Sequence, residues 1–172
     1  MGKKQKGHVV KFGLAGFARV QIARNGKLEG DSGWVHNVIT DYGLDEGLAQ
    51  VLASQGGSVR AAYAAIGTGT APGTAATSLN GENAATNGRD LLSYVTVTSA
   101  TGAGCTARFY GTFASTESRN TVTNFAMQNI GLYTGSAIAG SNLLCGATYA
   151  ASTLNTNQDV NYTYEWRFQT TT

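Results

Sequence analysis

Hydrophobic and polar residues alternate along most of the chain, which predicts β-strands rather than helices. The clearest case is 160–168, where the even positions carry V-Y-Y-W-F and the odd positions carry N-T-E-R. A strand of this kind has one buried face and one solvated face. The segments predicted as strands are Phe17–Arg24, Gly33–Ile39, Ala61–Ile66, Leu91–Ser99, Thr106–Ala114, Thr121–Leu132, Asn142–Tyr149 and Val160–Thr170.

One segment follows a helical period instead. Between 41 and 54 the leucines and valine recur at helical spacing, with Asp41 or Thr40 as the N-cap and Gly56–Gly57 as the stop. About eight strands and one helix predict a mainly β fold, an antiparallel β-sandwich of the jelly-roll kind with one short α-helix near residues 41–54. We expect a single sandwich domain over 17–172 and an extended basic N-terminal arm over 1–16.

The composition supports a globular protein. Of 172 residues, 42% are hydrophobic and only 13% are charged, with 23 glycines and a single proline. These values argue against a disordered segment, a coiled coil and a collagen-like fibre. The sequence shows neither a long apolar run nor a secretory signal, so we expect folding in a cytoplasm and no contact with a membrane.

The basic residues are unevenly distributed. Lys3, Lys4, Lys6 and Lys11 stand in the first eleven positions without an acidic neighbour, whereas all 10 acidic residues lie further along the chain. Such an arm either contacts an acidic protein or nucleic acid, or is a solvated and frayed terminus. The rest of the chain has no basic stripe with interleaved aromatic residues, which argues against a nucleic-acid reader.

Three blocks of sequence stand out in their order along the chain. The first is Trp34–Asp45 (WVHNVITDYGLD). The second joins Tyr63–Pro72 (YAAIGTGTAP) to Ser78–Glu82 (SLNGE), and the third joins Ile130–Thr134 (IGLYT) to Asn142–Cys145 (NLLC). Together they resemble a family of small structural proteins of tailed bacteriophages, with its N-x-I-x-D-x-G-L-D, a-I-G-T-G-x-x-A-P … t-x-L-x-x-E and E-I-G-L-F … L-L-a-R stretches.

Two positions depart from the family pattern. The family's arginine closely follows its glutamate, whereas Arg89 comes seven positions after Glu82, and Gln128–Asn129 stands where an acid often precedes Ile-Gly-Leu. Both departures weaken the case for an ion pair here. The resemblance as a whole implies a virion component, either a head decoration or a tail- or fibre-associated protein.

The residues that carry enzyme chemistry are sparse. Gly67–Gly69 follows a strand but opens no helix and has no G-K-[ST] after it, so a phosphate loop is not predicted. Asp45–Glu46 is the only adjacent acidic pair, and His36 lies within a predicted strand, where packing is the commoner role. The pattern therefore argues against an enzyme and predicts no cofactor.

The cysteines and histidines have no spacing that makes a zinc site, so no metal is predicted. Cys105 and Cys145 fit small buried hydrophobic residues, or one disulfide if their strands are neighbours. Exposed aromatic rings can stack on sugars, but on alternating strands they more often belong to the core or to a subunit interface. The aromatic residues in question are Trp34, Trp166, Tyr162 and Tyr164.

These observations favour a non-enzymatic structural protein of a bacteriophage virion, most of all a capsid decoration, cement or minor capsid protein. The expected partners are other virion proteins, the major capsid or tail proteins, and further copies of the chain as a homo-oligomer. The alternative is a tail- or tail-fibre-associated protein, including a receptor- or glycan-binding adhesin. The residues expected to bind partners are Lys3, Lys4, Lys6 and Lys11 in the arm and Thr68, Thr70 and Pro72 in the loop.

Overall fold

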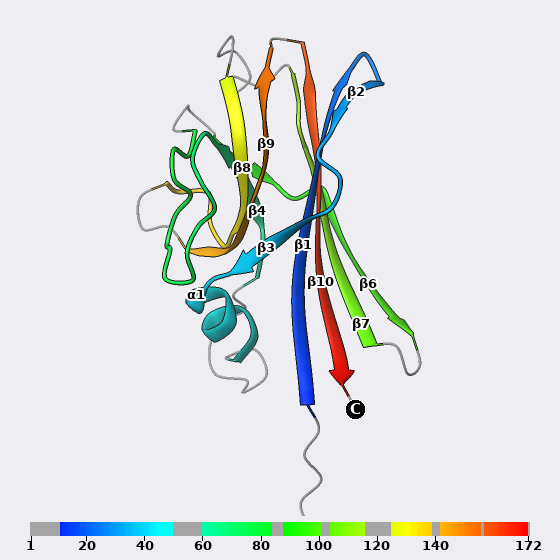
Figure 1. Cartoon of the computed structure of the whole chain (residues 1–172), viewed down its shortest axis with the longest axis vertical. Helices are drawn as coiled ribbons and strands as arrows, with labels where there is room; N and C mark the ends of the chain where they lie inside the picture. The colour runs from blue at the N-terminus through cyan, green and yellow to red at the C-terminus, as the bar shows by residue number, and fades with distance from the viewer. Residues whose placement is uncertain are drawn as a thin grey trace, which may run out of the picture.

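The protein is mainly antiparallel β with one short helix, as the sequence predicts (Figure 1). A computed structural model describes residues 11–49, 60–83, 88–100, 104–115, 125–138, 142–155 and 157–171. The elements in chain order are β1 (Lys11–Arg24), β2 (Lys27–Asp31), β3 (Val35–Ile39), α1 (Asp41–Leu44), the π-helical turn η1 (Asp45–Ala49), β4 (Tyr63–Gly67), β5 (Arg89–Leu91), β6 (Tyr94–Ala100), β7 (Gly104–Phe113), β8 (Phe125–Tyr133), β9 (Leu143–Leu154) and β10 (Asp159–Thr171). Within this part of the chain, no helix is long and apolar enough to cross a membrane.

The strands form one curled sheet in the order β5-β4-β8-β9-β3-β1-β10-β7-β6, with β2 paired to β1 beside β3. Strand β3 holds the two halves together, because Val35 and His36 pair with β1 while 37–39 pair with β9. The structure thus differs from the two separate sheets expected of a sandwich. A strand shared between both halves turns them into a half-barrel whose inner faces oppose each other.

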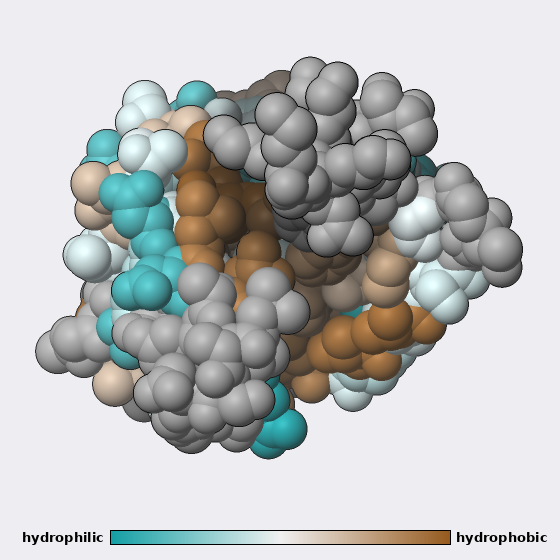
Figure 2. All heavy atoms as spheres, turned by 90° about the horizontal axis from the view of Figure 1, so that it is seen from below, coloured by the Kyte–Doolittle hydropathy of each residue, from teal (hydrophilic) through white to brown (hydrophobic). Residues whose placement is uncertain are grey.

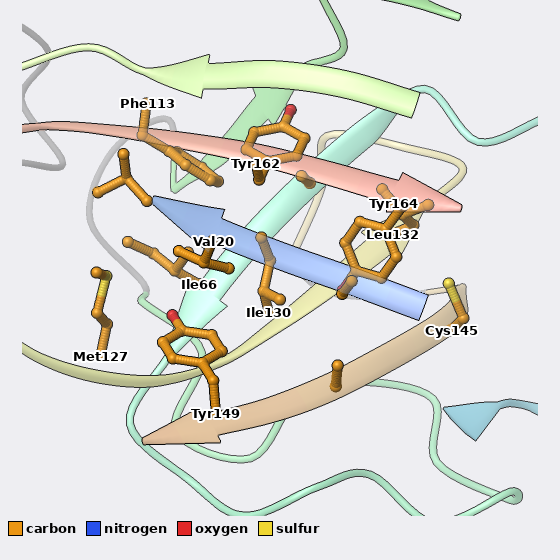
Figure 3. Close-up of a cluster of buried hydrophobic side chains, with 14 of the residues drawn as sticks. Val20, Ile66, Phe113, Met127, Ile130, Leu132, Cys145, Tyr149, Tyr162 and Tyr164 are labelled. Atoms are coloured by element: carbon orange, nitrogen blue, oxygen red, sulfur yellow. The ribbon is translucent and has the colours of Figure 1, made fainter. Parts of the chain in front are cut away.

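The core fills the space between the two halves of the curled sheet. Val20, Tyr162 and Tyr164 project from β1 and β10 toward Ile130 and Leu132 on β8 (Figure 3). All of these side chains are buried. Burial of aromatic and aliphatic groups on this scale, at about 25 cal/mol per Å² of apolar surface, is the main force that holds the curl closed.

The N-terminal arm is shorter than expected. Residues 11–16, assigned to the arm, are the first part of β1 and pair with the C-terminal part of β10, from Lys11 opposite Thr171 to Gly16 opposite Trp166. The strand continues because β10 is long enough to satisfy the backbone hydrogen bonds of these residues. The predicted tether is therefore confined to residues 1–10, which lie outside the described part.

The turn after β1 is the tight hairpin that Asn25–Gly26 predicts. Both residues have positive φ, 50° and 77°, as a type I′ turn requires. The hairpin leads into β2, a strand that the sequence does not predict because its K-L-E-G-D pattern is charged and short. The predicted successor strand, Gly33–Ile39, is instead β3 and begins at Val35.

The described part of the predicted helix, up to Ala49, is α1 followed by η1, and residues 50–54 lie outside the described part. Thr40 is its N-cap, since its hydroxyl accepts a hydrogen bond of 3.0 Å from the backbone N–H of Gly43. The same hydroxyl donates to the β9 carbonyl groups of Leu143 and Leu144, the latter at 3.0 Å. One buried side chain thus begins the helix and fixes it to the sheet.

Candidate protein-binding interface

Strand β6 forms one edge of the curled sheet. It pairs with β7 along its whole length, from Tyr94 opposite Tyr110 to Ala100 opposite Gly104, and lies at the end of the strand order. Its sequence, Y-V-T-V-T-S-A, is rich in β-branched residues, which suits a strand. It holds no charged residue, and the side chains of 94–99 are all exposed.

Two other edge strands, β2 and β5, are protected in ways that β6 is not. Strand β2 exposes Lys27, Glu29 and Asp31, and its pairing with β1 is shifted by an irregularity between Ile22 and Ala23. Strand β5 has three residues only. Charges, bulges and short length are the usual means by which a sheet edge avoids pairing with other chains. Of these three edge strands, only β6 lacks all three.

An apolar hollow opens at the lower end of the molecule (Figure 2), and β7, the neighbour of β6, forms part of its wall. Its volume is about 240 Å³, and it lies between β7, β10 and the helical segment. Phe109 and Trp166 meet edge to face there, with 6.0 Å between ring centroids. The lining residues are Gly47, Arg60, Ala61, Ala107, Phe109, Leu144, Trp166 and Phe168.

Two valines of β6 extend this apolar surface to the edge of the sheet. Val95 lies opposite Phe109 and Val97 opposite Ala107, and residues opposite each other in a ladder share a face. The valines are 48% and 70% exposed. An exposed apolar strip that continues into a hollow is typical of an interaction site.

The outer face of the same half carries charged and aromatic side chains. Glu165 on β10 is buried there, with its carboxylate 2.6 Å from Nε of Arg108 and in contact with Nε of Arg167. Burial alone would raise the pKa of this carboxyl, but the hydrogen bonds and charges of the two arginines outweigh burial and hold the pKa below its ordinary value. Tyr94 stacks on Tyr110 in the same face, with ring centroids 4.4 Å apart.

The loop after β4 lies on the outer face of the other half. Asn129 of β8 holds it by donating from Nδ2 to the carbonyl groups of Thr70 and Asn80, at 3.2 and 2.8 Å. Thr68 and Thr70 are exposed, as a binding role requires. Pro72, in contrast, is buried and packs close to Gly146.

An ion pair lies beneath this loop, against the expectation from sequence spacing. Nε of Arg89 is 2.7 Å from Oε1 of Glu82, and the two side chains are 1% and 6% exposed. A bridge between Gly67 and Glu82 brings the glutamate back to β4, whose neighbour β5 carries Arg89. The guanidinium also lies 3.5 Å over the ring of Tyr133, whose hydroxyl donates to Glu82 at 2.6 Å. Burial, the largest cause, raises the pKa of Tyr133, with the neighbouring carboxylate adding to the effect.

The remaining predicted site residues are dispersed. Lys3, Lys4 and Lys6 lie outside the described residues, and Lys11 begins β1 at the lower end. His36 is exposed and packs against Phe17, with 4.7 Å between ring centroids. Across the described ranges, no three histidine, cysteine or acidic side chains are grouped as metal ligands would be.

The two cysteines are both free thiols, on strands of different halves. Cys105 on β7 is half-buried and Cys145 on β9 is buried. Burial, the main cause, raises the pKa of Cys145 to about 12, which leaves it a neutral thiol. The prediction of small buried hydrophobic residues is thus confirmed for Cys145.

Three of the aromatic residues weighed as a sugar-binding surface belong to the core. Tyr162, Tyr164 and Trp166 are at most 5% exposed, whereas Trp34 is 44% exposed. The structure instead presents a surface that the sequence pattern did not single out, the edge and inner face of β6. A signal was available, since the segment 94–100 is an uncharged run of alternating valine and threonine.

Comparison of the chain with models of protein families, with curated proteins and with solved structures found no match.

Proposed function

We propose that this chain is a non-enzymatic structural protein that binds neighbouring protein subunits. One observation carries the proposal: strand β6, an exposed and uncharged edge, pairs with β7, which lines an apolar hollow. An unpaired strand edge offers backbone hydrogen bonds to another chain, and the apolar strip beside it offers surface to bury. A surface with both features suits a polypeptide better than a small ligand.

The use of the acidic side chains fits this proposal. Asp31 is held by Arg19, Glu82 by Arg89, and Glu165 by Arg108 and Arg167. Carboxylates that accept charge-assisted hydrogen bonds from arginines fix the arrangement of the strands, which suits a structural protein.

We further propose that the neighbours are other proteins of a bacteriophage virion. The support is the resemblance of Trp34–Asp45, Tyr63–Glu82 and Ile130–Cys145 to small structural proteins of tailed bacteriophages. A capsid decoration, cement or minor capsid protein, bound to the major capsid protein, is the favoured role. As part of this proposal, the curled sheet is an opened form of a jelly-roll-like sandwich, because its halves face each other across one core.

The experiment that tests this role is the copy number of the chain in purified virions of the phage that encodes it. Quantitative mass spectrometry against the major capsid protein is expected to give hundreds of copies in a simple ratio. A few tens of copies would instead indicate a tail- or fibre-associated protein. Absence from particles would overturn the virion role.

The basic arm has a separate test. Deletion of residues 2–10 removes Lys3, Lys4 and Lys6 but leaves β1 complete, so the fold is expected to persist. If the arm is a tether to a neighbour, the shortened chain is lost from particles. Full incorporation of the shortened chain would contradict the tether.

A glycan-binding adhesin receives less support. Of the aromatic residues weighed for such a site, only Trp34 is exposed to the extent that ring stacking on a sugar requires.

A further inference from the structure

We propose that β6 joins two copies of this chain, with the two β6 strands paired antiparallel about a two-fold axis. This inference rests on the proposed function and names the partner of the same surface. It makes the β6 contact isologous, so that each copy presents the same residues to the other.

The first argument is the unused side of the strand. Strand β6 pairs on one side with β7, and no other strand in the described ranges pairs with it. Backbone N–H and C=O groups on the far side of an edge strand are satisfied by water or by another chain. The exposure of every side chain over 94–99 leaves room for a strand to approach.

The second argument is that the β6 sequence is complementary to itself. If Thr96 lies on the two-fold axis, Val95 faces Val97 of the other copy, and Tyr94 faces Thr98 of the other copy. Aliphatic pairs and pairs of an aromatic with a β-branched residue are both favourable across a ladder. No like charges meet, because the strand Tyr94–Ala100 carries no charge at all.

The third argument concerns the inner face. Antiparallel pairing in this register keeps inner-face residues opposite inner-face residues, so all four valines of the two strands lie on the side of the apolar hollows. Val97 is the most exposed of the large hydrophobic residues in the described ranges, at 70%. Pairing with a second copy covers it and joins the two hollows along one continuous face.

The register makes the proposal testable by cross-linking. Thr96→Cys places two thiols directly opposite each other, with Cα atoms about 4.5–5.5 Å apart, inside the range for a disulfide. Thr98→Cys is the matched control, because its thiols lie about 13 Å apart along the strands. Both positions are exposed threonines of the same strand face.

Under mild oxidation of the full chain, Thr96→Cys is expected to give covalent dimers on a non-reducing gel, whereas Thr98→Cys and the wild type stay monomeric. Equal cross-linking of the two variants, or none by Thr96→Cys, would overturn the proposed pairing.

A second measurement uses charge in place of a thiol. Sedimentation equilibrium is expected to show a dimer of the wild-type chain and a dissociation constant raised at least about tenfold in Val97→Lys, because each lysine places a charge opposite Val95 and diagonal to the other lysine. Leu91→Lys, at a residue that is 62% exposed on β5, is the control and is expected to leave dimerisation unchanged. A wild-type chain that stays monomeric at about 100 µM would overturn the proposal.

The two proposals fail separately. A chain that dimerises in solution but is absent from virions would keep the β6 contact and lose the virion role. A chain found in virions but monomeric in solution, without the Thr96→Cys cross-link, would keep the virion role and lose the β6 contact.

Discussion

Individual charged residues hold positions that the alternating pattern does not predict. Glu165 falls on the polar side of the β10 pattern, yet it is 1% exposed. Its burial is possible because Arg108, from a strand far away in sequence, and Arg167 both bind the carboxylate. Arg89 is buried for the same reason, with Glu82 as its partner. A buried charge requires a partner, and the partner is chosen by the fold.

The first prediction concerns the buried pair. Arg89→Met is expected to lower the free energy of unfolding by about 3–5 kcal/mol, because it leaves the carboxylate of Glu82 buried without its counter-charge. Arg24→Met is the control: Arg24 pairs with Glu29 at the surface, where an ion pair contributes less than about 1 kcal/mol. Urea unfolding of both variants measures the difference. Equal losses of unfolding free energy would show that the buried pair stabilises the protein no more than the surface pair does.

The second prediction is a pH dependence. The folded pKa of Glu165 lies below its unfolded value, so this carboxylate stabilises the protein above the unfolded pKa and loses that effect as the pH falls through the folded pKa. Glu165→Gln is expected to flatten the decline of stability between about pH 5 and pH 3. The midpoints of urea unfolding of the wild type and of Glu165→Gln, taken across this pH range, measure the difference. If stability declines equally with pH in the two proteins, Glu165 does not contribute to the pH dependence.

At the scale of elements, the short helix depends on its contact with β9. Gly43 is buried, and a Cβ at this position would collide with the carbonyl oxygen of Leu144. A backbone atom of the sheet has no room to move aside, so only glycine lets α1 approach this closely. The helical period of 41–54 indicated a helix, but this close approach is visible only in the assembled fold.

Two glycine-to-alanine substitutions test the contact between α1 and β9. Gly43→Ala is expected to destabilise the protein by about 1–3 kcal/mol through overpacking against β9. Gly73→Ala is the control, since a Cβ there meets no atom within 4 Å and the backbone is not in the left-handed region. Thermal unfolding followed by circular dichroism compares them. A neutral Gly43→Ala would mean that the helix moves away from the sheet at little cost.

At the scale of the whole molecule, one strand ties the halves together. Strand β3 pairs with β1 and with β9, and one cluster of buried residues draws on both halves. The main core therefore belongs to both halves, although a smaller cluster of Ala65, Leu79, Tyr133 and Leu143 lies within one of them.

Unfolding is consequently expected to be a single cooperative transition. Tryptophan fluorescence reports on Trp166 in the core together with the exposed Trp34, and far-ultraviolet circular dichroism reports on the sheet as a whole. The two signals are expected to give the same midpoint in urea. Separate midpoints would indicate that the halves unfold independently and would contradict the single domain over 17–172.

Local order could be read from the chain itself. The alternation in 160–168, the Asn25–Gly26 turn and the Thr40 cap each depend on neighbouring residues, and all three are confirmed. The tertiary structure alone decided that Arg89 meets Glu82, that Pro72 is buried and that β6 forms an unprotected edge beside the hollow. These features join segments that are distant in sequence, and periodicity within a segment carries no information about which other segment will lie beside it.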